Sequence, residues 1–419
     1  MGDKMNTKYN GAIEKLKKYN QEHVISILET IEETKKENLV NQILNVDFEN
    51  ITNLYEELTK KKEINTDNIE TIKAIKKELL DTEKLSEYIK TGEDIIKSNK
   101  FALATMSGGQ GTRLGFNGPK GTFKVNINPK PKYLFEILAD SLIEINNKYS
   151  CSIPWYIMTS EENNNDIKDF FAKNNYFGYE KSNIKFFSQG NLPLLSKDGK
   201  ILIDEEFNIK QAADGNGGIF NSMYKNGIIK DIEEKDIKWV FIGSIDNILL
   251  KIADPLLIGV AESTGVEIAT KSIPKNSPEE KVGAICKQDG KVKVIEYSEM
   301  PKELAIVKDE NDEFMYGESH IMCNLFSKEA LNKLSNKKLP YHIAFKKYNF
   351  IDENGKIVIA ENPNAYKFES FIFDSFAYFN DIAVLRGKRE EDFAPIKNKE
   401  GIDSPKTAIE LYNNYMKNK

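Results

Sequence analysis

The chain has 419 residues, of which 40% are hydrophobic and 30% are charged, a composition typical of a globular protein with two or three domains. Acidic residues outnumber basic ones by 65 to 59, for a net charge of −6, which argues against nucleic acid as the main partner because no basic surplus neutralises phosphates. No apolar run is long enough to span a membrane, and the chain begins without an apolar signal region. We therefore expect a cytoplasmic protein with no membrane partner.

Cysteine and histidine are few and scattered, which argues against a disulfide framework, a zinc site or a catalytic triad. The cysteines lack a C-x-x-C pattern and are expected to be reduced and mostly buried; they are Cys151, Cys286 and Cys323. The histidines are His23, His320 and His342, and none lies in a suitable motif. We expect His23 at the surface, because it precedes an amphipathic helix.

Residues 1–97 are predicted to form a helical domain, since they contain almost no glycine or proline. One helix is indicated by apolar residues at helical spacing, Val24, Ile27, Leu28 and Ile31. A second is predicted after the capping-box pattern Asp67–Glu70, with an apolar stripe of Ile69, Ile72 and Leu79. Thr91–Asp94 is expected to begin a short helix that leads into the first strand.

From residue 98 onward, predicted strands alternate with predicted helices. The strands are Phe101–Met106, Trp155–Thr159, Ile184–Ser188, Trp239–Gly243 and Glu267–Ser272, and the helices include Tyr133–Asn146 and Asp166–Asn174. The alternation predicts an α/β, Rossmann-like domain over residues 98–365, with a mixed, mostly parallel sheet between helices. A hairpin is predicted from Val282–Lys287 and Val292–Tyr297, with Asp289-Gly290 as its turn. Residues 366–419 are predicted as a small C-terminal domain.

The segment Ser107-Gly-Gly-Gln-Gly-Thr-Arg-Leu-Gly115 directly follows the first predicted strand, and Pro119-Lys120-Gly121 comes next. Glycines at a strand end let backbone N–H groups approach a phosphate, and Arg113 and Lys120 add positive charge. The segment lacks the G-x-x-x-x-G-K-[ST] pattern, and Leu114 stands where a dinucleotide fingerprint needs its third glycine. The pattern favours a nucleoside triphosphate whose pyrophosphate leaves; a purely structural turn is the alternative.

Two segments farther along the chain carry residues suited to a nucleotide site. Gln211–Gly218 places Asn216 among three glycines before a helix, and a flexible surface loop is the alternative. Asp246 follows the strand Trp239–Gly243, where a carboxylate can hold Mg²⁺ against phosphates or can instead cap a helix. The glycine-rich segment, Gln189 and Asp246 all follow predicted strands, so they can converge on one crevice.

Two weaker segments complete the set. Glu296-Tyr-Ser-Glu299 is by itself typical of a solvated strand end. Pro363–Asp374 is rich in aromatic residues that suit a core, and Lys367 is the lone cation within it.

In this order the segments resemble the eukaryotic-type UDP-N-acetylglucosamine pyrophosphorylases, within the wider group of UDP-sugar pyrophosphorylases. The resemblance extends from about residue 100 to the C-terminus. Further matching segments are Pro154–Ser160, Ser188–Pro193, Asp246–Leu249, Ala253–Pro255, Val282–Cys286 and Asp392–Asn398. The resemblance implies a uridylyltransferase that forms a UDP-sugar and pyrophosphate from UTP and a hexose 1-phosphate, with N-acetylglucosamine 1-phosphate as the best guess.

The resemblance also implies a role for each motif residue. The nucleotide would be bound by Gly108, Gly109, Gln189, Gly215 and Asn216, with the Gln189 amide facing uracil. The sugar would be bound by Asn216, Gly283, Glu296, Tyr297, His320 and Asn324. Phosphate charge would be neutralised by the catalytic residues Arg113, Lys120 and Lys367, and Asp246 would hold Mg²⁺ or Mn²⁺.

The chain departs from the family most clearly in Gly317–Asn324, where Ser319-His320 replaces a Gly-Asn pair that faces the sugar in relatives. His320 and Asn324 could bond an N-acetyl group, or the His320 ring could fill its space and leave glucose or galactose as substrate. A glucose-specific or broad UDP-sugar pyrophosphorylase and a catalytically silent nucleotide-sugar sensor are therefore the alternatives. A dehydrogenase is rejected for want of the third glycine. We expect a monomer or a weak homo-oligomer.

Overall fold

The computed structural model describes residues 2–59 and 67–418, and the chain divides into two compact units. The first unit consists of Met1–Glu63, Gly190–Gly215 and Pro340–Phe371, and the second of Ile64–Gln189, Asn216–Leu339 and Ile372–Lys419. The units interleave along the chain, whereas the sequence predicted three consecutive domains, 1–97, 98–365 and 366–419. That three-domain division stays a prediction.

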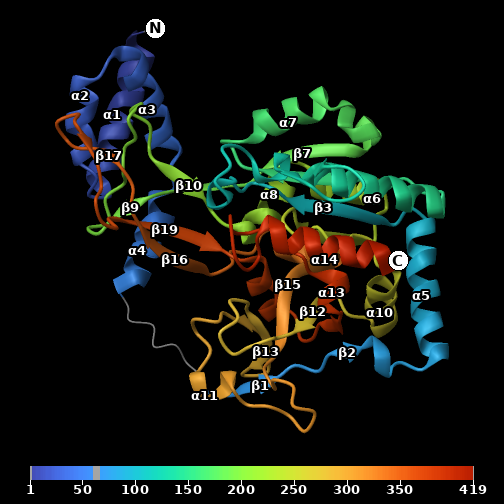
Figure 1. The fold of residues 1–419 in the computed structure, drawn as a ribbon. Helices are drawn as coiled ribbons and strands as arrows, with labels where there is room; N and C mark the ends of the chain where they lie inside the picture. Colours follow the sequence, from blue (N-terminus) through green and yellow to red (C-terminus); the bar gives the residue numbers. More distant parts are fainter. Residues whose placement is uncertain (1, 60–66, 419) are drawn as a thin grey trace. The chain divides into compact units, whose positions relative to one another are not determined.

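The second unit is built on one large sheet (Figure 1). Its main path runs β2 (Ile75–Lys76), β20 (Ala383–Arg386), β12 (Ile268–Pro274), β15 (Glu318–Ser327), β11 (Trp239–Ser244), β3 (Phe101–Met106), β6 (Trp155–Thr159) and β7 (Ile184–Ser188). Neighbours are parallel except that β15 is antiparallel to β11 and β12. The mixed, mostly parallel α/β sheet is thus confirmed, and the carboxyl ends of β3, β6, β7, β11 and β12 share one edge.

A hairpin extends the sheet beside β15. Strands β13 (Ala284–Gln288) and β14 (Lys291–Ile295) pair around Asp289-Gly290, whose φ angles are +51° and +73°, and β13 also pairs with β15 through Ala284 and Ser319. The left-handed backbone at both turn positions is what a two-residue hairpin needs, so the Asp-Gly signal is confirmed. A short separate ladder joins β4 (Lys124–Val125) and β5 (Lys132–Tyr133).

Helices cover the sheet and bury its strands. The α-helices of this unit are α5 (Thr82–Lys97), α6 (Leu134–Tyr149), α7 (Asn164–Lys173), α8 (Ile219–Lys225), α9 (Ile228–Glu234), α10 (Pro255–Thr264), α11 (Lys302–Ala305), α12 (Lys328–Leu334), α13 (Arg389–Asp392) and α14 (Pro405–Asn418). Every residue of β3 and β6 is buried. These strands read as continuous apolar runs because helices exclude water from both faces.

Helix α5 begins earlier than the sequence predicted. It starts at Thr82, with Asp81 accepting a hydrogen bond from the Lys84 N–H, so Thr91–Asp94 lies inside it and the predicted start there is wrong. Gly92 is in the helix because α10 packs against it: a Cβ at Gly92 would lie 1.9 Å from the Pro255 carbonyl oxygen. The glycine therefore marks a close helix contact rather than a helix end.

The helix predicted after Asp67–Glu70 is also wrong. Residues Ile69–Thr71 form strand β1, which pairs antiparallel with β13, and β2 pairs parallel with β20; the 3-10 turn Lys77–Leu79 follows. Partners more than 200 residues away along the chain supply these pairings, so tertiary contacts outweigh the local helical spacing.

The first unit packs four helices against strands. The helices are α1 (Gly2–Lys18), α2 (His23–Thr30), α3 (Glu33–Asn45) and α4 (Phe48–Thr59), and the strands are β8 (Asn191–Pro193), β9 (Leu195–Ser196), β10 (Gln211–Ala213), β16 (Tyr341–Lys346), β17 (Phe350–Ile351), β18 (Ile357–Val358) and β19 (Ala365–Ser370). Two glutamine side chains connect the helical part to residues 201–209. Gln21 accepts a hydrogen bond from the Ile201 N–H at 2.9 Å, and Gln42 accepts one from the Ile209 N–H at 2.7 Å. His23 is part-buried and bonds the Ile201 carbonyl at 2.9 Å, so its expected surface position is wrong.

The cysteines are unpaired and mostly buried, as the sequence predicted. All three cysteines are free; Cys286 and Cys323 are buried and Cys151 is part-buried. Among residues 2–59 and 67–418, no helix combines the length and apolar character required to cross a membrane.

Candidate active site

The glycine loop, residues 107–121, is held by buried groups at the carboxyl edge of the sheet. Ser107 donates from its hydroxyl to the Met158 carbonyl at 2.8 Å, and Asn163, which is fully buried, donates to the Gly108 carbonyl at 3.0 Å. The loop then folds back on itself, because the Lys120 N–H donates to the Gly109 carbonyl at 3.0 Å. Its shape is therefore fixed from both ends.

The start of the loop leaves backbone donors available. Within the described part of the chain, the N–H groups of Gly108 and Gly109 donate to no acceptor. A Cβ at Gly109 would meet no atom within 4 Å, so open space lies beside it. Unpaired N–H groups beside open space, at a strand end, form an anion-binding surface.

Gln189 lies directly against this surface. It follows β7, and its N–H donates to the Thr159 carbonyl at 2.8 Å. A Cβ at Gly108 would come within 2.9 Å of Gln189 Oε1, so a side chain at this position would displace the Gln189 amide. No hydrogen bond to the Gln189 side-chain amide exists among the described residues, so its donor and acceptor are free for a ligand.

Asp246 and Lys120 meet at the same edge. The Lys120 Nζ lies 3.0 Å from Asp246 Oδ2, and the two side chains are 15% and 19% exposed. Burial raises the pKa of Asp246, but the charges of Lys120 and Lys397 and a hydrogen bond from Ser244 outweigh it, so the pKa lies below its usual range. The loop after β11 leads into α10, which Asp254 caps, so the alternative that Asp246 caps a helix is wrong.

The metal prediction can be compared with this donor set. No group of three histidine, cysteine or acidic side chains that could hold a metal occurs in the portions of chain described. Mg²⁺ usually takes only one or two protein carboxylates and completes its shell with phosphate oxygens and water. A single ionised Asp246 thus fits an ion that binds together with a nucleotide, and does not fit a resident structural metal.

The residues predicted to bind sugar converge around His320. The His320 N–H donates to the Gly283 carbonyl at 2.9 Å, and a Cβ at Gly283 would lie 3.3 Å from Glu296 Oε1. Asn216 is linked to this group by the 3-10 segment Ile372–Tyr378. The Asn216 Oδ1 accepts a hydrogen bond from the Ile372 N–H at 2.8 Å. Two rings of that segment, Phe373 and Phe376, lie with centroids 5.6 and 5.7 Å from that of His320.

His320 itself is buried, with 7% exposure, and is bonded to Asn324. Its Nε2 lies 2.8 Å from Asn324 Oδ1, which also accepts from the Thr270 hydroxyl at 2.9 Å. Burial lowers the pKa of His320 to about 4, and the Asn324 contact only partly offsets this. The ring is therefore neutral near pH 7. With Nε2 assigned as the donor to Asn324, Nδ1 is left as an acceptor.

The bulge of β15 lets His320 and Asn324 meet although they are four residues apart. The register against β12 shifts between Asn324 and His320, and Met322 within the bulge has φ +57°. The network is not fully satisfied: in the described residues, Asn324 Nδ2 and the Ser319 hydroxyl are buried without a partner. Buried orphan groups of this kind mark a site where a polar ligand or water completes the bonding.

The other predicted residues divide between exposed positions and the first unit. Arg113 is exposed in the glycine loop and Tyr297 is 45% exposed. Lys367 lies on β19 and Gly215 has φ +91°, both in the first unit. Lys367, the one cation of its segment, is paired with an acid of the same strand: its Nζ lies 2.8 Å from Glu369 Oε1.

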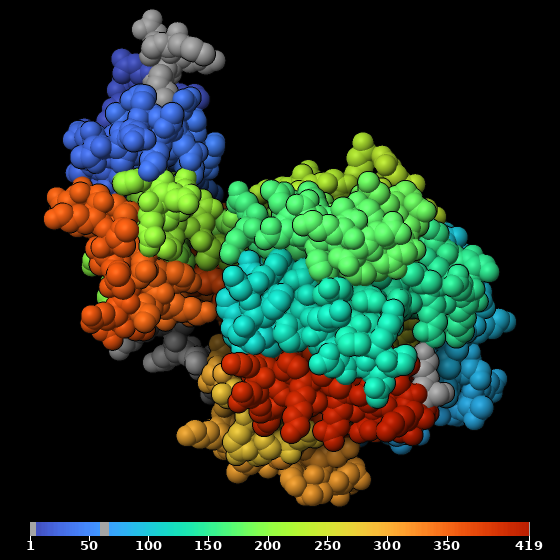
Figure 2. Space-filling view, turned by 45° about the horizontal axis from the view of Figure 1, so that its top comes forward, coloured from blue at the N-terminus to red at the C-terminus, as the bar shows by residue number. Residues whose placement is uncertain are grey.

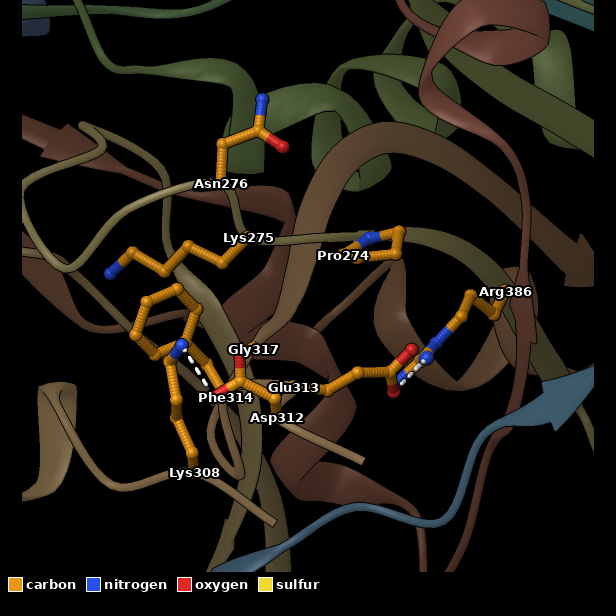
Figure 3. Close-up of a pocket in the computed structure, with 9 residues that line it drawn as sticks. All are labelled: Pro274, Lys275, Asn276, Lys308, Asp312, Glu313, Phe314, Gly317 and Arg386. Carbon is orange, nitrogen blue, oxygen red and sulfur yellow. Dashed lines mark hydrogen bonds and ion pairs between the residues drawn. The ribbon is translucent and has the colours of Figure 1, made fainter. Parts of the chain in front are cut away.

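A separate charged cavity of about 250 Å³ contains none of the predicted site residues (Figure 3). Its lining includes Lys308, Asp312, Glu313 and Arg386. These charged side chains form ion pairs with one another: Arg386 lies 2.6 Å from Glu313, and Lys308 lies 2.8 Å from Asp312. This cavity is therefore bordered by ion pairs that hold the sheet edge together.

Sequence reasoning missed the residues that hold the site in place. Asn163 fixes Gly108, and Asn247, next to Asp246, donates to the Asp392 carbonyl at 2.7 Å. Neither has a motif of its own. Asn247 stands beside Asp246 in a segment the sequence had already marked, and this adjacency was the only signal.

Known proteins resemble the chain over most of its length. A family model described as UTP–glucose-1-phosphate uridylyltransferase matches residues 46–404. The UDP-N-acetylhexosamine pyrophosphorylase-like protein 1 of Xenopus tropicalis is 35% identical over 338 residues, which cover 78% of this chain and 66% of the frog protein. The match thus spans just under two thirds of the frog protein's length.

Two further relatives extend the likeness. The UDP-N-acetylglucosamine pyrophosphorylase of Saccharomyces cerevisiae is 37% identical over 343 residues, covering 79% of this chain and 72% of the yeast protein. A crystal structure of the uridine diphosphate N-acetylglucosamine pyrophosphorylase of Trypanosoma brucei matches with a TM-score of 0.81 and 26% identity, covering 96% of this chain and 84% of that one.

Proposed function

Because this chain belongs to the UTP–glucose-1-phosphate uridylyltransferase family, we propose that it is a UTP:sugar-1-phosphate uridylyltransferase. The reaction joins UTP and a hexose 1-phosphate into a UDP-sugar and releases pyrophosphate. The observation that carries the proposal within the molecule is the Lys120–Asp246 pair beside the free N–H groups of Gly108 and Gly109. This set combines an anion-binding backbone, a cation and a carboxylate at one strand edge.

The chemistry requires no nucleophile from the protein. A phosphate oxygen of the sugar 1-phosphate is already an anion, and it attacks the α-phosphorus of UTP in line with the departing pyrophosphate. The protein must bring two anions together and balance the charge that develops. This agrees with a site that supplies backbone N–H groups and lysines instead of a Ser-His-Asp arrangement.

Each part of the site then has a task. Gly108 and Gly109 would bind the triphosphate through their N–H groups, and Gln189 would pair with the uracil edge. Lys120 and Arg113 would stabilise the pyrophosphate, and we assign Lys367 to the α-phosphoryl group. Asp246 would hold Mg²⁺ or Mn²⁺, which when bound would neutralise phosphate charge.

N-acetylglucosamine 1-phosphate is the sugar we propose, since relatives named for UDP-N-acetylglucosamine synthesis match most of the chain. The sugar would lie against Asn216, Gly283, Glu296 and Tyr297. The orphan groups around His320 and Asn324 suit an acetamido group, which offers one donor and one acceptor. The bulk of the buried His320 ring favours the alternative, glucose or galactose 1-phosphate.

One assay separates these candidates. The protein is incubated with UTP, Mg²⁺ and one of N-acetylglucosamine, glucose or galactose 1-phosphate, and pyrophosphate release is followed for the protein and for Lys120→Ala. Release that depends on Lys120 supports the proposal, and kcat/KM ratios identify the sugar. Binding of UTP without release from any sugar would instead identify a nucleotide-sugar sensor. The cytoplasmic location and the monomeric or weakly oligomeric state stay predictions.

A further inference from the structure

The charged cavity of Figure 3 is formed where the ends of β12 and β20 meet the loop before β15. Among its lining residues Lys275 is buried, whereas Asn276, Lys308 and Asp312 are exposed, so the cavity opens to solvent. Figure 2 shows the gold-to-orange residues of this region at the surface of the second unit. The volume of about 250 Å³ is below the range of about 300–1,000 Å³ for drug-sized ligands, so the cavity suits a small ion or acid.

Lys275 brings an unpaired ammonium group to this cavity. The residue is only 8% exposed, and among the residues that the structure describes its Nζ forms no hydrogen bond or ion pair. A lysine is almost never buried without a partner, because removing an ammonium from water costs free energy. Burial accordingly lowers the pKa of Lys275, and the charges of Glu280 and Glu279 offset this only in part. The buried ammonium therefore lacks the partner that it would normally have.

The neighbouring acid Glu280 is held by other groups. Its Oε1 lies 2.7 Å from the Arg389 guanidinium, and its Oε2 accepts a hydrogen bond from the Asn276 N–H at 2.8 Å. The backbone of Lys275 is fixed as well, because its N–H donates to the Gly317 carbonyl at 2.9 Å. The lysine and this carboxylate are thus each held in place without pairing with one another.

The charges around the cavity leave one positive charge in excess. The lining contains three basic side chains, Lys275, Lys308 and Arg386, and two acidic ones, Asp312 and Glu313. The outer partners of the Arg386–Glu313 pair are one base and one acid, so counting them leaves the excess unchanged. Figure 3 shows the Lys275 side chain extending towards the Phe314 ring and away from that pair. The excess charge therefore lies at Lys275, beside an aromatic wall.

We propose that this cavity is an anion site in which Lys275 binds a small oxyanion, a carboxylate or a phosphate group. An ammonium is a compact charge with three donors, so it can bond directly to the oxygens of either group. The Phe314 ring offers an apolar surface to a short carbon chain on that anion. The cavity shares no lining residue with the proposed UTP and sugar site. The alternative is that Lys275 is an uncharged amine that needs no ligand.

The test compares Lys275→Met with a matched control in the full chain. Lys281→Met removes an exposed ammonium of the same segment that does not line the cavity. Binding of acetate, benzoate and inorganic phosphate is measured by titration calorimetry at neutral pH, and thermal unfolding is recorded with and without each anion. We expect at least one anion to bind and to raise the melting temperature. Lys275→Met should weaken that binding by about 10- to 100-fold, Lys275→Arg should restore most of it, and Lys281→Met should leave it unchanged.

Because phosphate can also bind at the glycine loop, Lys120→Ala is titrated alongside. Failure of all three anions to bind, equal binding by Lys275→Met, or a loss in Lys120→Ala in place of Lys275→Met would each overturn the proposal. If Lys275→Met does not fold, the Lys275 Cε resonance of the unmodified protein decides, after assignment through Lys275→Arg. That resonance must move when the anion is added, and a resonance that stays in place would overturn the site. Failure to release pyrophosphate from UTP would refute the proposed function and leave this result unchanged.

Discussion

Burial of His320 predicts that acid destabilises the second unit through this one ring. Its pKa is lowered from 6.5 to about 4 in the folded protein, first because burial disfavours the charged ring. The unfolded chain therefore binds more protons than the folded one between these two pH values. By linkage, the stability that the neutral ring contributes is complete above about pH 6.5 and is lost as the pH falls towards 4.

The size of the effect follows from the two pKa values. One pKa unit is worth about 1.4 kcal/mol, so the full loss on acidification is about 3 kcal/mol. Between about pH 7.5 and pH 5, where other carboxylates change little, the loss is about 2 kcal/mol. His320→Gln keeps an amide that can donate to Asn324 but does not titrate. The unfolding free energies of the two proteins should therefore converge as the pH falls.

Urea unfolding at several pH values measures this difference directly. Other titrating groups contribute equally to both proteins, so the pH dependence of the difference belongs to His320. A histidine Cε1 resonance that shows no titration above pH 5 would give the same answer without a variant. A stability difference that does not change with pH, together with a ring that titrates near 6.5, would refute the burial argument.

Further expectations concern the phosphate and base sites. Lys120→Ala and Lys367→Ala should each lower kcat by on the order of 10²-fold with a much smaller effect on UTP affinity; near-normal turnover in both would remove their assigned roles. Activity should require Mg²⁺ or Mn²⁺ and be lost in Asp246→Ala, so full activity in excess chelator would contradict the metal role. UTP should be used faster than CTP, and Gln189→Leu should reduce that preference; equal initial rates with both nucleotides would count against Gln189.

The strands at the centre of the sheet were predictable because they are buried on both faces. Phe101–Met106 and Trp155–Thr159 are observed with the predicted bounds. Ile184–Ser188 also has its predicted bounds, although it is the edge strand and its Lys185 is exposed. A parallel strand between two helix layers has no solvent side, so it reads as one apolar run that ends at a glycine or polar residue. The ends of the predicted strands locate the carboxyl edge of the sheet. Gln189 and Asp246 were predicted at this edge because each follows a predicted strand.

The elements that the sequence mispredicted owe their structure to distant partners. Ile69–Thr71 becomes a strand because β13 offers an edge, and Gly92 lies within a helix because Pro255 lies against it. The hydrogen bond from Asn247 to the Asp392 carbonyl has the same origin. Local spacing contains no information about such partners, so a single sequence could indicate the motif residues but not the residues that position them.

For the proposed reaction, the Lys120–Asp246 ion pair predicts that UTP and the proposed metal ion bind as a unit. Both side chains are largely buried, and leaving either charge unpaired there costs several kcal/mol. A phosphate that takes Lys120 leaves Asp246 without its partner unless a cation replaces the ammonium. A metal ion on Asp246 would in turn release Lys120 for a phosphate. Each ligand therefore removes the penalty that the other would meet alone, so the pair disfavours binding of either without the other.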